Sequence, residues 1–569
     1  MTVSSSIPVG LSTSNSNLFM RKVKAILWVC MLMLVNTVMY AQQDTVYAQQ
    51  DTVAQEDYVY LLNSDVISFN QYLNPDAQIL IGNVIFRHDS MYMYCDSAVF
   101  FQEANSFNAY HNVRAEQGDT LFLYGDSLYY DGNTKLLRVR DNVRLENRTM
   151  VLLTDSLNYD RNTNLGWFFD GGTLLDEEST LISEYGQFDT SVKLATFTDG
   201  VSLEGPDYTL TTDTLVYSTD AHVAFISCPT TIVSDESTIN SSRGVFNTDT
   251  HYAVLLDRSV IDQNKGESIM TGDSIIYDRN QGRMNGFGNV VINNYKDKID
   301  VLGEYVFYDQ NIDSAVVTGK ALMIEYSQGD SLFMHADTFR LKTFYDEAGD
   351  SVVERHVRGF HKVRGYRPDL QMVADSIQFS TKDSTLTLFD DPIIWSKGQQ
   401  ILGEKIICYL NDSTLDWVHV IGQALFVEML DTTNYNQIAG REMKAFFKDG
   451  DIDHADVNGN VLAVFYPEDE DSAFIGMNYT EASMLTAYFE MRAVKRIVII
   501  GQSNGTMYPM DQIDQKFRYL PNFNWFARIR PLDAEDVFYW RGKNVEEKLK
   551  KSSSIRGVPM PTLNKNKKK

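Results

Sequence analysis

One pattern recurs along most of this chain and limits the folds that the chain can adopt. It reads "GDSLYYDGNTKLLRVRDNV" at residues 125–143, "TDSLNYDRNTNLGWFFDGG" at 154–172 and "GDSIIYDRNQGRMNGFGNV" at 272–290. Its Asp-Ser-apolar-x-aromatic core returns about fourteen times, at steps of 29 to 31 residues between Asp96 and Glu304. A unit of this length cannot bury an apolar face alone, so successive copies must stack on one another.

A second signature lies roughly halfway along each copy and ends in valine. It reads "GNV" at 82–84, 288–290 and 459–461, "HNV" at 111–113, "DNV" at 141–143 and "DGV" at 199–201. Asn and Gly tolerate a positive φ and favour irregular backbone. We therefore expect a bend or a β-bulge at each of these sites.

Within a copy, apolar and polar residues alternate with period two. Leu137 and Val139 share one parity and Arg138 and Arg140 the other, which is typical of a half-buried strand. Turn formers such as "YDGNT" and "YDRNT" separate these runs. The sequence predicts an all-β protein, elongated and antiparallel, with a short helical or irregular C-terminal tail. A helix is expected only from about Asp533.

The composition narrows the classes of function. The formal net charge of −26 argues against nucleic-acid binding, which relies on Lys and Arg. Residues 541–569 are the exception, with ten Lys or Arg against two Glu. This basic run is predicted to be either a solvated tail or a contact with anionic lipid headgroups.

The N-terminal region has the charged, apolar, small-residue order of a secretory signal peptide. Arg21, Lys22 and Lys24 precede an apolar run, and cleavage is expected after Ala41 or Ala48. A retained membrane anchor is the alternative. The expected domains are an N-terminal extension with signal peptide (1–41), a linker (42–57), regular repeats (58–330), repeats with insertions (331–509) and a C-terminal extension (510–569).

The sequence gives little support for disulfide bonds, a metal site or catalysis. The three cysteines after the signal peptide, Cys95, Cys228 and Cys408, are odd in number and widely spaced, so no disulfide framework is predicted. The nine His residues suggest no metal cluster, and no His recurs with the Asp-Ser pairs. We predict no catalytic residue, no metal and no cofactor.

With these motifs in place, the chain resembles the OstA-like (LptA-like) family of lipopolysaccharide transport. The resemblance rests on the "DS-apolar-x-YD…T…apolar…GNV" unit over residues 60–505 and is strongest at 80–325. It implies a periplasmic β-jellyroll that carries the acyl chains of lipopolysaccharide inside. It also implies edge-strand pairing with other transport components and end-to-end self-association. The chain has about twice or more the repeats of the usual bridge proteins and lacks the translocon's long C-terminal barrel.

The repeated apolar residues of one parity are the candidates for a lipid groove, although the same residues could form a dry core. These candidates are Leu128, Tyr130, Val143, Leu157, Tyr159, Val201, Leu215, Tyr217, Ile275, Tyr277 and Val290. Open sheet edges are expected in the first unit (58–90) and the last (480–510).

The favoured function is therefore periplasmic lipopolysaccharide binding and delivery to the outer membrane, with the protein associated with that membrane. Two alternatives remain, an outer-membrane β-barrel and a surface-exposed repetitive adhesin. The apolar segment 519–531 could dock on the β-structure or on a partner.

Overall fold

A computed structural model describes residues 58–542, apart from short gaps at 71, 73, 149, 177, 236, 328, 347–351, 412–413, 449–450, 470, 472 and 491–492. All described residues belong to one compact unit. The predicted signal peptide, the whole linker (42–57) and the basic run after 542 lie outside the described residues.

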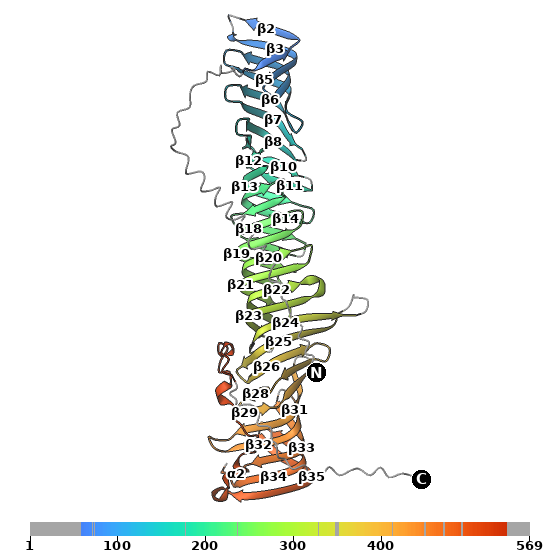
Figure 1. Cartoon of the computed structure of the whole chain (residues 1–569), viewed down its shortest axis with the longest axis vertical. Helices are drawn as coiled ribbons and strands as arrows, with labels where there is room; N and C mark the ends of the chain where they lie inside the picture. The colour runs from blue at the N-terminus through green and yellow to red at the C-terminus, as the bar shows by residue number, and fades with distance from the viewer. Residues whose placement is uncertain are drawn as a thin grey trace, which may run out of the picture. The chain divides into compact units, whose positions relative to one another are not determined.

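Nearly all of the described chain forms strands, as Figure 1 shows. The first eighteen are β1 (Tyr60–Asn63), β2 (Val66–Asn70), β3 (Asn74–His88), β4 (Met91–Phe101), β5 (Ser106–Gln117), β6 (Leu121–Asp131), β7 (Leu136–Asn147), β8 (Met150–Asp160), β9 (Leu165–Phe168), β10 (Gly172–Asp176), β11 (Ser179–Ser183), β12 (Tyr185–Asp189), β13 (Leu194–Glu204), β14 (Tyr208–Ser218), β15 (Val223–Ile226), β16 (Thr230–Ser234), β17 (Ser237–Ser241) and β18 (Arg243–Asn247).

The remaining strands are β19 (Tyr252–Gln263), β20 (Ser268–Asp278), β21 (Arg283–Asn294), β22 (Ile299–Asp309), β23 (Ser314–Glu325), β24 (Leu332–Tyr345), β25 (Val352–Arg367), β26 (Leu370–Ser380), β27 (Thr385–Phe389), β28 (Ile393–Ser396), β29 (Gln399–Leu402), β30 (Lys405–Asn411), β31 (Thr414–Met429), β32 (Tyr435–Lys448), β33 (Asp451–Phe465), β34 (Gly476–Glu490) and β35 (Ala493–Pro509). The helical elements are η1 (Gln310–Ile312), η2 (Met510–Gln512), α2 (Gln515–Arg518), η3 (Ala527–Ile529) and η4 (Asp536–Phe538).

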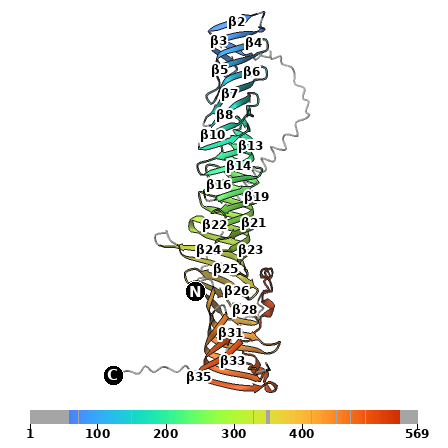
Figure 2. The same ribbon diagram turned by 180° about the vertical axis from the view of Figure 1, so that it is seen from behind.

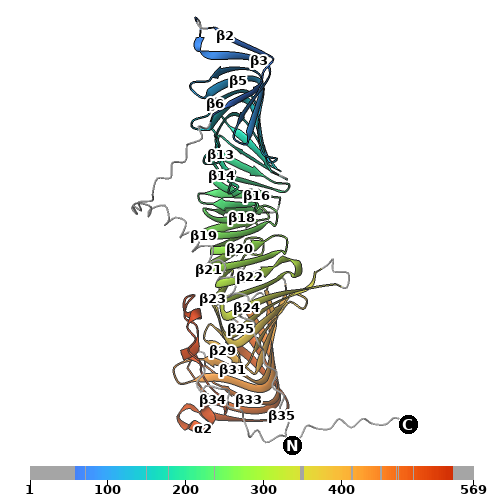
Figure 3. The ribbon, with the colours of Figure 1, turned by 45° about the horizontal axis from the view of Figure 1, so that its top comes forward.

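The strands pair antiparallel with their neighbours in one continuous stack, which confirms the predicted all-β antiparallel fold (Figures 1 and 2). Most long strands bend once near the middle, so that one half of each strand belongs to one wall and the other half to a second wall (Figure 3). We call these halves wall A and wall B.

Wall A consists of segments 66–70, 78–81, 97–101, 106–110, 127–131, 136–140, 156–160, 165–168, 185–189, 194–198, 214–218, 223–226, 243–247, 252–256, 274–278, 283–287, 305–309, 314–318, 338–345, 352–360, 376–380, 385–389, 405–411, 414–421, 442–448, 451–458, 484–490 and 493–500. Wall B consists of 60–63, 84–88, 91–94, 113–117, 121–124, 143–147, 150–154, 172–176, 179–183, 201–204, 208–212, 230–234, 237–241, 259–263, 268–271, 290–294, 299–302, 321–325, 332–336, 363–367, 370–374, 393–396, 399–402, 424–429, 435–440, 461–465, 476–482 and 503–509.

The corner between the walls is built by the second signature. Asp141 and Asn142 have φ of 61° and 52°, and Gly288 and Asn289 have 69° and 44°. Two consecutive left-handed residues shift the strand register, as between Arg140 and Val143 on β7. The predicted bend is therefore confirmed, and Asn, Asp and Gly occur there because they tolerate positive φ.

The two sequence signatures contact each other at this corner. The asparagine side chain of the second signature donates to the aspartate that opens the first signature on a neighbouring strand. The pairs are Asn142–Asp126 (2.6 Å), Asn112–Asp96 (2.7 Å), Asn289–Asp273 (2.8 Å) and Asn83–Asp65 (2.9 Å). One hydrogen bond thus explains why both signatures recur in register.

The inward-facing residues of both walls form one hydrophobic core that extends from Val59 to Phe489. Around β25 to β34, the outer face of wall B carries a second core that includes Trp395, Leu425 and Val427. In this part, apolar runs such as "ALFVEML" replace the alternation seen upstream, which is typical of strands buried on both faces.

Residues 510–542, which we call the strap, cover this second core. The strap runs back along the stack from the end of β35 to the level of β24 and β25 (Figures 1 and 3). Leu520, Phe526 and Ile529 are buried in the second core, so the segment 519–531 docks on the β-structure of its own chain.

The helix expected from Asp533 does not form within the described residues. Only one turn of 3-10 helix occurs, η4, and the rest of the predicted helix lies beyond 542. Asp536 is buried and bonds to Arg364 of wall B and to Arg541, which fixes this stretch against the sheet. Tertiary contacts here override the helical pattern of the sequence.

Candidate functional site

The eleven candidate groove residues all belong to the core between the walls. Ten are at most 2% exposed, and Tyr277 is half-buried and packs against the same core. Leu128, Tyr130, Leu157, Tyr159, Leu215, Tyr217, Ile275 and Tyr277 come from wall A, and Val143, Val201 and Val290 are the first residues of wall B after each corner. The repeat therefore brings equivalent positions together along one interior.

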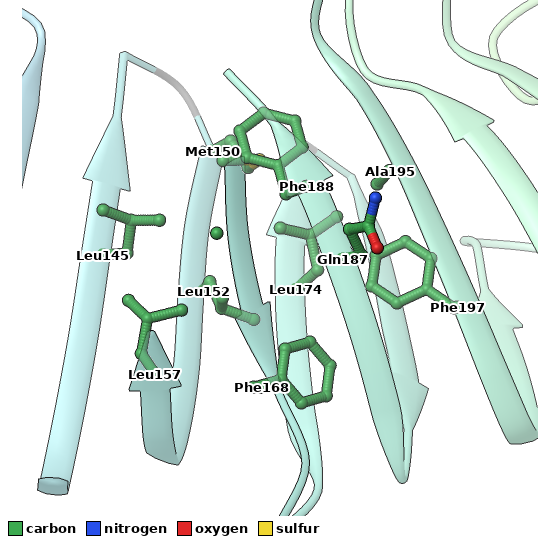
Figure 4. Close-up of a pocket in the computed structure, with 11 residues that line it drawn as sticks. Leu145, Met150, Leu152, Leu157, Phe168, Leu174, Gln187, Phe188, Ala195 and Phe197 are labelled. Atoms are coloured by element: carbon green, nitrogen blue, oxygen red, sulfur yellow. The ribbon is translucent and has the colours of Figure 1, made fainter. Parts of the chain in front are cut away.

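This interior is closely packed in the structure. Phe86 of wall B stacks on Phe107 of wall A with ring centroids 4.0 Å apart. A void lined by Leu157, Phe168 and Phe188, among others, has a volume of about 10 Å³, room for little more than one water molecule (Figure 4). The walls would have to separate before a hydrocarbon chain could lie between them.

Opposite the corners, the turns of wall A face the turns of wall B along a line that we call the seam. Asp89 of wall B pairs with Lys135 (2.8 Å) and Arg161 (3.6 Å) of wall A. His88 shares a hydrogen bond of 2.5 Å with Tyr130, and Arg161 donates to the same phenol oxygen at 2.9 Å. Polar groups therefore join the two walls at the rim of an apolar interior.

The seam is closed in the same way further along. Tyr217 donates to Asp176 of wall B at 3.1 Å, and His222 lies 3.5 Å from the same carboxylate. Arg279 of wall A pairs with Asp207 of wall B at 2.5 Å. Burial raises the pKa of Tyr217, so its hydroxyl stays protonated and can donate at neutral pH.

At the first strands the interior is less covered. Ile67 of β2 lies opposite the buried Leu80 and therefore faces inward, yet Ile67 and Phe69 are each 58% exposed. At the other end, Ile499 and Ile500 of β35 are 40% and 50% exposed, and within the described residues β35 pairs with β34 alone. Apolar surface and unpaired strand edges thus coincide at both predicted ends.

The sequence reasoning missed the seam, and it left open whether the segment 519–531 docks on the β-structure or on a partner. The seam residues lie in turns or at the ends of strands, where the sequence resembles ordinary solvated loops, and their partners across the seam lie 41 to 72 residues away in the chain. Docking on the chain's own sheet could have been predicted from the continuous apolar runs of β31 and β33. Such runs indicate strands that are buried on both faces, so another segment must cover their outer face.

Within the described ranges of 58–542, no group of three or more His, Cys, Asp or Glu side chains is placed to hold a metal ion. In the same part of the chain, no helix is long and apolar enough to cross a membrane.

Comparison with known proteins gives one match. Residues 56–213 match the family model described as OstA-like protein, a span that contains the most regular repeats. No curated protein matches the chain. The corner motif and the two walls are present in the matched span, and residues 56–213 are similar to the OstA-like family.

Proposed function

We propose that this chain is a periplasmic lipopolysaccharide-binding protein that shields acyl chains between walls A and B and helps to deliver lipopolysaccharide to the outer membrane. The observation that carries the proposal is the single apolar core that the two walls share from Val59 to Phe489. Burial is worth about 0.8 kcal/mol per CH₂, or roughly 9 kcal/mol for a twelve-carbon chain. A row of equivalent positions lets a lipid advance while most of its apolar contacts persist.

Loading requires the seam to open, because the interior is filled by side chains. The ion pairs of the seam, such as Asp89–Lys135 and Arg279–Asp207, are half-buried or exposed and individually weak. The hydrogen bonds His88–Tyr130 and Tyr217–Asp176 are buried and cost more to break. On both sides of each corner, backbone ladders join neighbouring strands, and the pairing is interrupted only at the corner residues. Separation of the walls at the seam, with the corner as hinge, therefore costs less than any break in the stack.

The unpaired edges at the first and last strands support the second part of the proposal, delivery through contacts with other proteins. The edge strands β2 and β35 are suited to pair with strands of other lipopolysaccharide-transport components or with a second copy, end to end. We assign the described residues a binding role and no catalytic one, and we keep the divisions 1–41, 42–57, 58–330, 331–509 and 510–569 as working domains.

A covalent lock across the seam tests this function. Asp89→Cys and Lys135→Cys, in a Cys228→Ser background, would be joined by a short bismaleimide in the purified protein. The lock should lower the amount of lipopolysaccharide bound per chain, because acyl chains can no longer part the walls.

The matched control joins Glu267→Cys to Lys296→Cys, a turn pair 3.1 Å apart that lies entirely on wall B. This lock should leave lipopolysaccharide binding unchanged. Equal binding by the cross-seam lock, the same-wall lock and the unlinked protein would count against loading between the walls.

A further inference from the structure

The outer face of wall A carries two arginines directly opposite each other. Arg340 of β24 is the cross-strand partner of Arg358 of β25, and the next pair on this face is Lys342 with His356. Arg340, Lys342 and Arg358 are exposed. Like charges directly opposite on a sheet are destabilising, so this arrangement costs stability unless an anion lies between them.

Neighbouring cations on the same strands are neutralised and these three are not. Lys362 pairs with Asp337 at 2.9 Å and Arg355 pairs with Asp313 at 3.2 Å. Among the described residues, no carboxylate forms an ion pair with Arg340, Lys342 or Arg358. In a chain of net charge −26, an uncompensated group of three cations is a local exception.

Aromatic rings hold two of these cations in place. The Arg340 guanidinium lies 5.6 Å from the centroid of the Phe360 ring, and the Lys342 ammonium lies 4.8 Å from that of Phe344. These contacts restrict the side chains without neutralising them. The positive groups are thereby kept together on one face, as a preformed anion site requires.

The polar neighbours indicate the kind of anion. The strand next to Arg358 presents Ser376 and Gln378 on the same face, and Thr338 lies beside Arg340. The carboxylate of Glu354 on this face is occupied by Ser380 and His356. Hydroxyl and amide groups suit a ligand rich in hydroxyls better than the hydrocarbon of a bilayer. A pair of guanidinium groups recognises phosphate by parallel charge-assisted hydrogen bonds.

We infer that Arg340, Arg358 and Lys342 form a binding site for a phosphate group carried by a saccharide, on the outside of wall A. The choice of saccharide rests on the proposed function, since a lipopolysaccharide whose acyl chains lie inside must keep its phosphorylated sugars outside. The geometry of the site itself is independent of any lipid between the walls.

Calorimetric titration of the purified chain with deacylated lipopolysaccharide, which retains the phosphorylated sugars, tests the site. The double variant Arg340→Gln/Arg358→Gln should bind at least about tenfold more weakly than the wild type, with a smaller salt dependence. Lys362→Gln and Arg138→Gln, exposed cations outside the group, should bind as the wild type does. Without ligand, the melting temperature of the double variant should be unchanged or higher, because the repulsion is gone.

Several results would overturn the inference. They are unchanged affinity in the double variant, equal affinity for the phosphatase-treated saccharide, or a lowered melting temperature without ligand. If the chain binds inorganic phosphate or phosphatidylglycerol vesicles but not the deacylated lipopolysaccharide, the saccharide is rejected as the ligand. Because the probe has no acyl chains, failure here leaves the seam-lock result untouched, and the two proposals are tested separately.

Discussion

Asn142 donates its side-chain N–H to the carboxylate of Asp126 at 2.6 Å, across two neighbouring strands at the corner between walls A and B. The same bond forms between Asn112 and Asp96. The two most recognisable residues of the repeat are therefore partners, and both serve the bend that creates two walls. Asp126 is thereby explained as a structural residue, not as part of an Asp-Ser catalytic pair.

A double-mutant cycle should detect this bond. Asp126→Ala and Asn142→Ala should each destabilise the chain, and their coupling should be about 0.5–1 kcal/mol, because the bond is exposed but involves a charged acceptor. Urea unfolding of the wild type, both single variants and the double variant gives the coupling. A coupling of zero would mean that the two residues act separately.

Glycine at the corner has a steric reason as well as a conformational one. Gly288 has φ of +69°, and a Cβ there would lie 2.6 Å from Asp273 Oδ2, whereas Gly200 has φ of +68° with open space around it. Gly288→Ala should therefore cost about 2 kcal/mol or more and Gly200→Ala about 1 kcal/mol. Unfolding free energies measure both, and equal costs would show that the contact with Asp273 is unimportant.

Docking of the strap on wall B should depend on hydrogen bonds from buried amide side chains. Gln400 is fully buried, donates to Asn524 O at 2.8 Å and accepts from Phe526 N at 2.9 Å. Gln400→Glu loses the donor and buries a charge, so the strap should loosen at a cost of about 1–3 kcal/mol or more. Limited proteolysis should then cut within 510–542 faster than in the wild type.

The exposed Gln281→Glu is the control for this change and should leave the cleavage rate unaltered. If Gln400→Glu is cleaved at the wild-type rate as well, the amide contacts do not hold the strap.

The reactivity of the three cysteine thiols should measure how closely the core is packed. Burial raises the pKa of Cys95 and of Cys408 to about 12, so both remain protonated and unreactive at pH 8. Iodoacetamide followed by mass spectrometry should label the half-buried Cys228 in the folded chain and the other two only after unfolding. Rapid labelling of Cys408 in the folded protein would contradict the packing of the core.

The same thiols predict a pH dependence of stability. Their folded pKa lies above the unfolded value of 9.0, so their contribution is complete below about pH 9 and declines as the pH rises towards 12. Cys408→Ser should reduce this decline in urea unfolding series between pH 8 and 11. An unchanged slope would assign the alkaline loss of stability to other groups.

Much of the fold could be predicted from the sequence because period-two alternation and turn residues are local signals. Leu157 and Tyr159 reveal their shared face without knowledge of any distant residue, and Asn142 marks its bend in the same way. The corner at Gly319 and Lys320 does not show the Asn of the second signature, because Lys takes its place. Both residues nevertheless have positive φ, and Lys320 pairs with Glu304 at 3.4 Å.

The candidate site was less predictable because it depends on long-range contacts. The parity of Leu128 or Ile275 says that each side chain points inward, but not that the opposite wall is in contact with it. The seam between Asp89 and Lys135 joins turns 46 residues apart, and Arg364 meets Asp536 across 172 residues. Neither pair leaves a local pattern.

The most direct test of lipid carriage is photo-crosslinking in cells. A photoreactive residue would replace Tyr159 or Tyr277, which face the interior, or Leu153, which is apolar but points outward from wall B and is 39% exposed. Lipopolysaccharide should crosslink at both inward positions and much less at Leu153. Absence of crosslinks at Tyr159 and Tyr277, or crosslinks no stronger than at Leu153, would contradict the proposal that acyl chains travel between the walls.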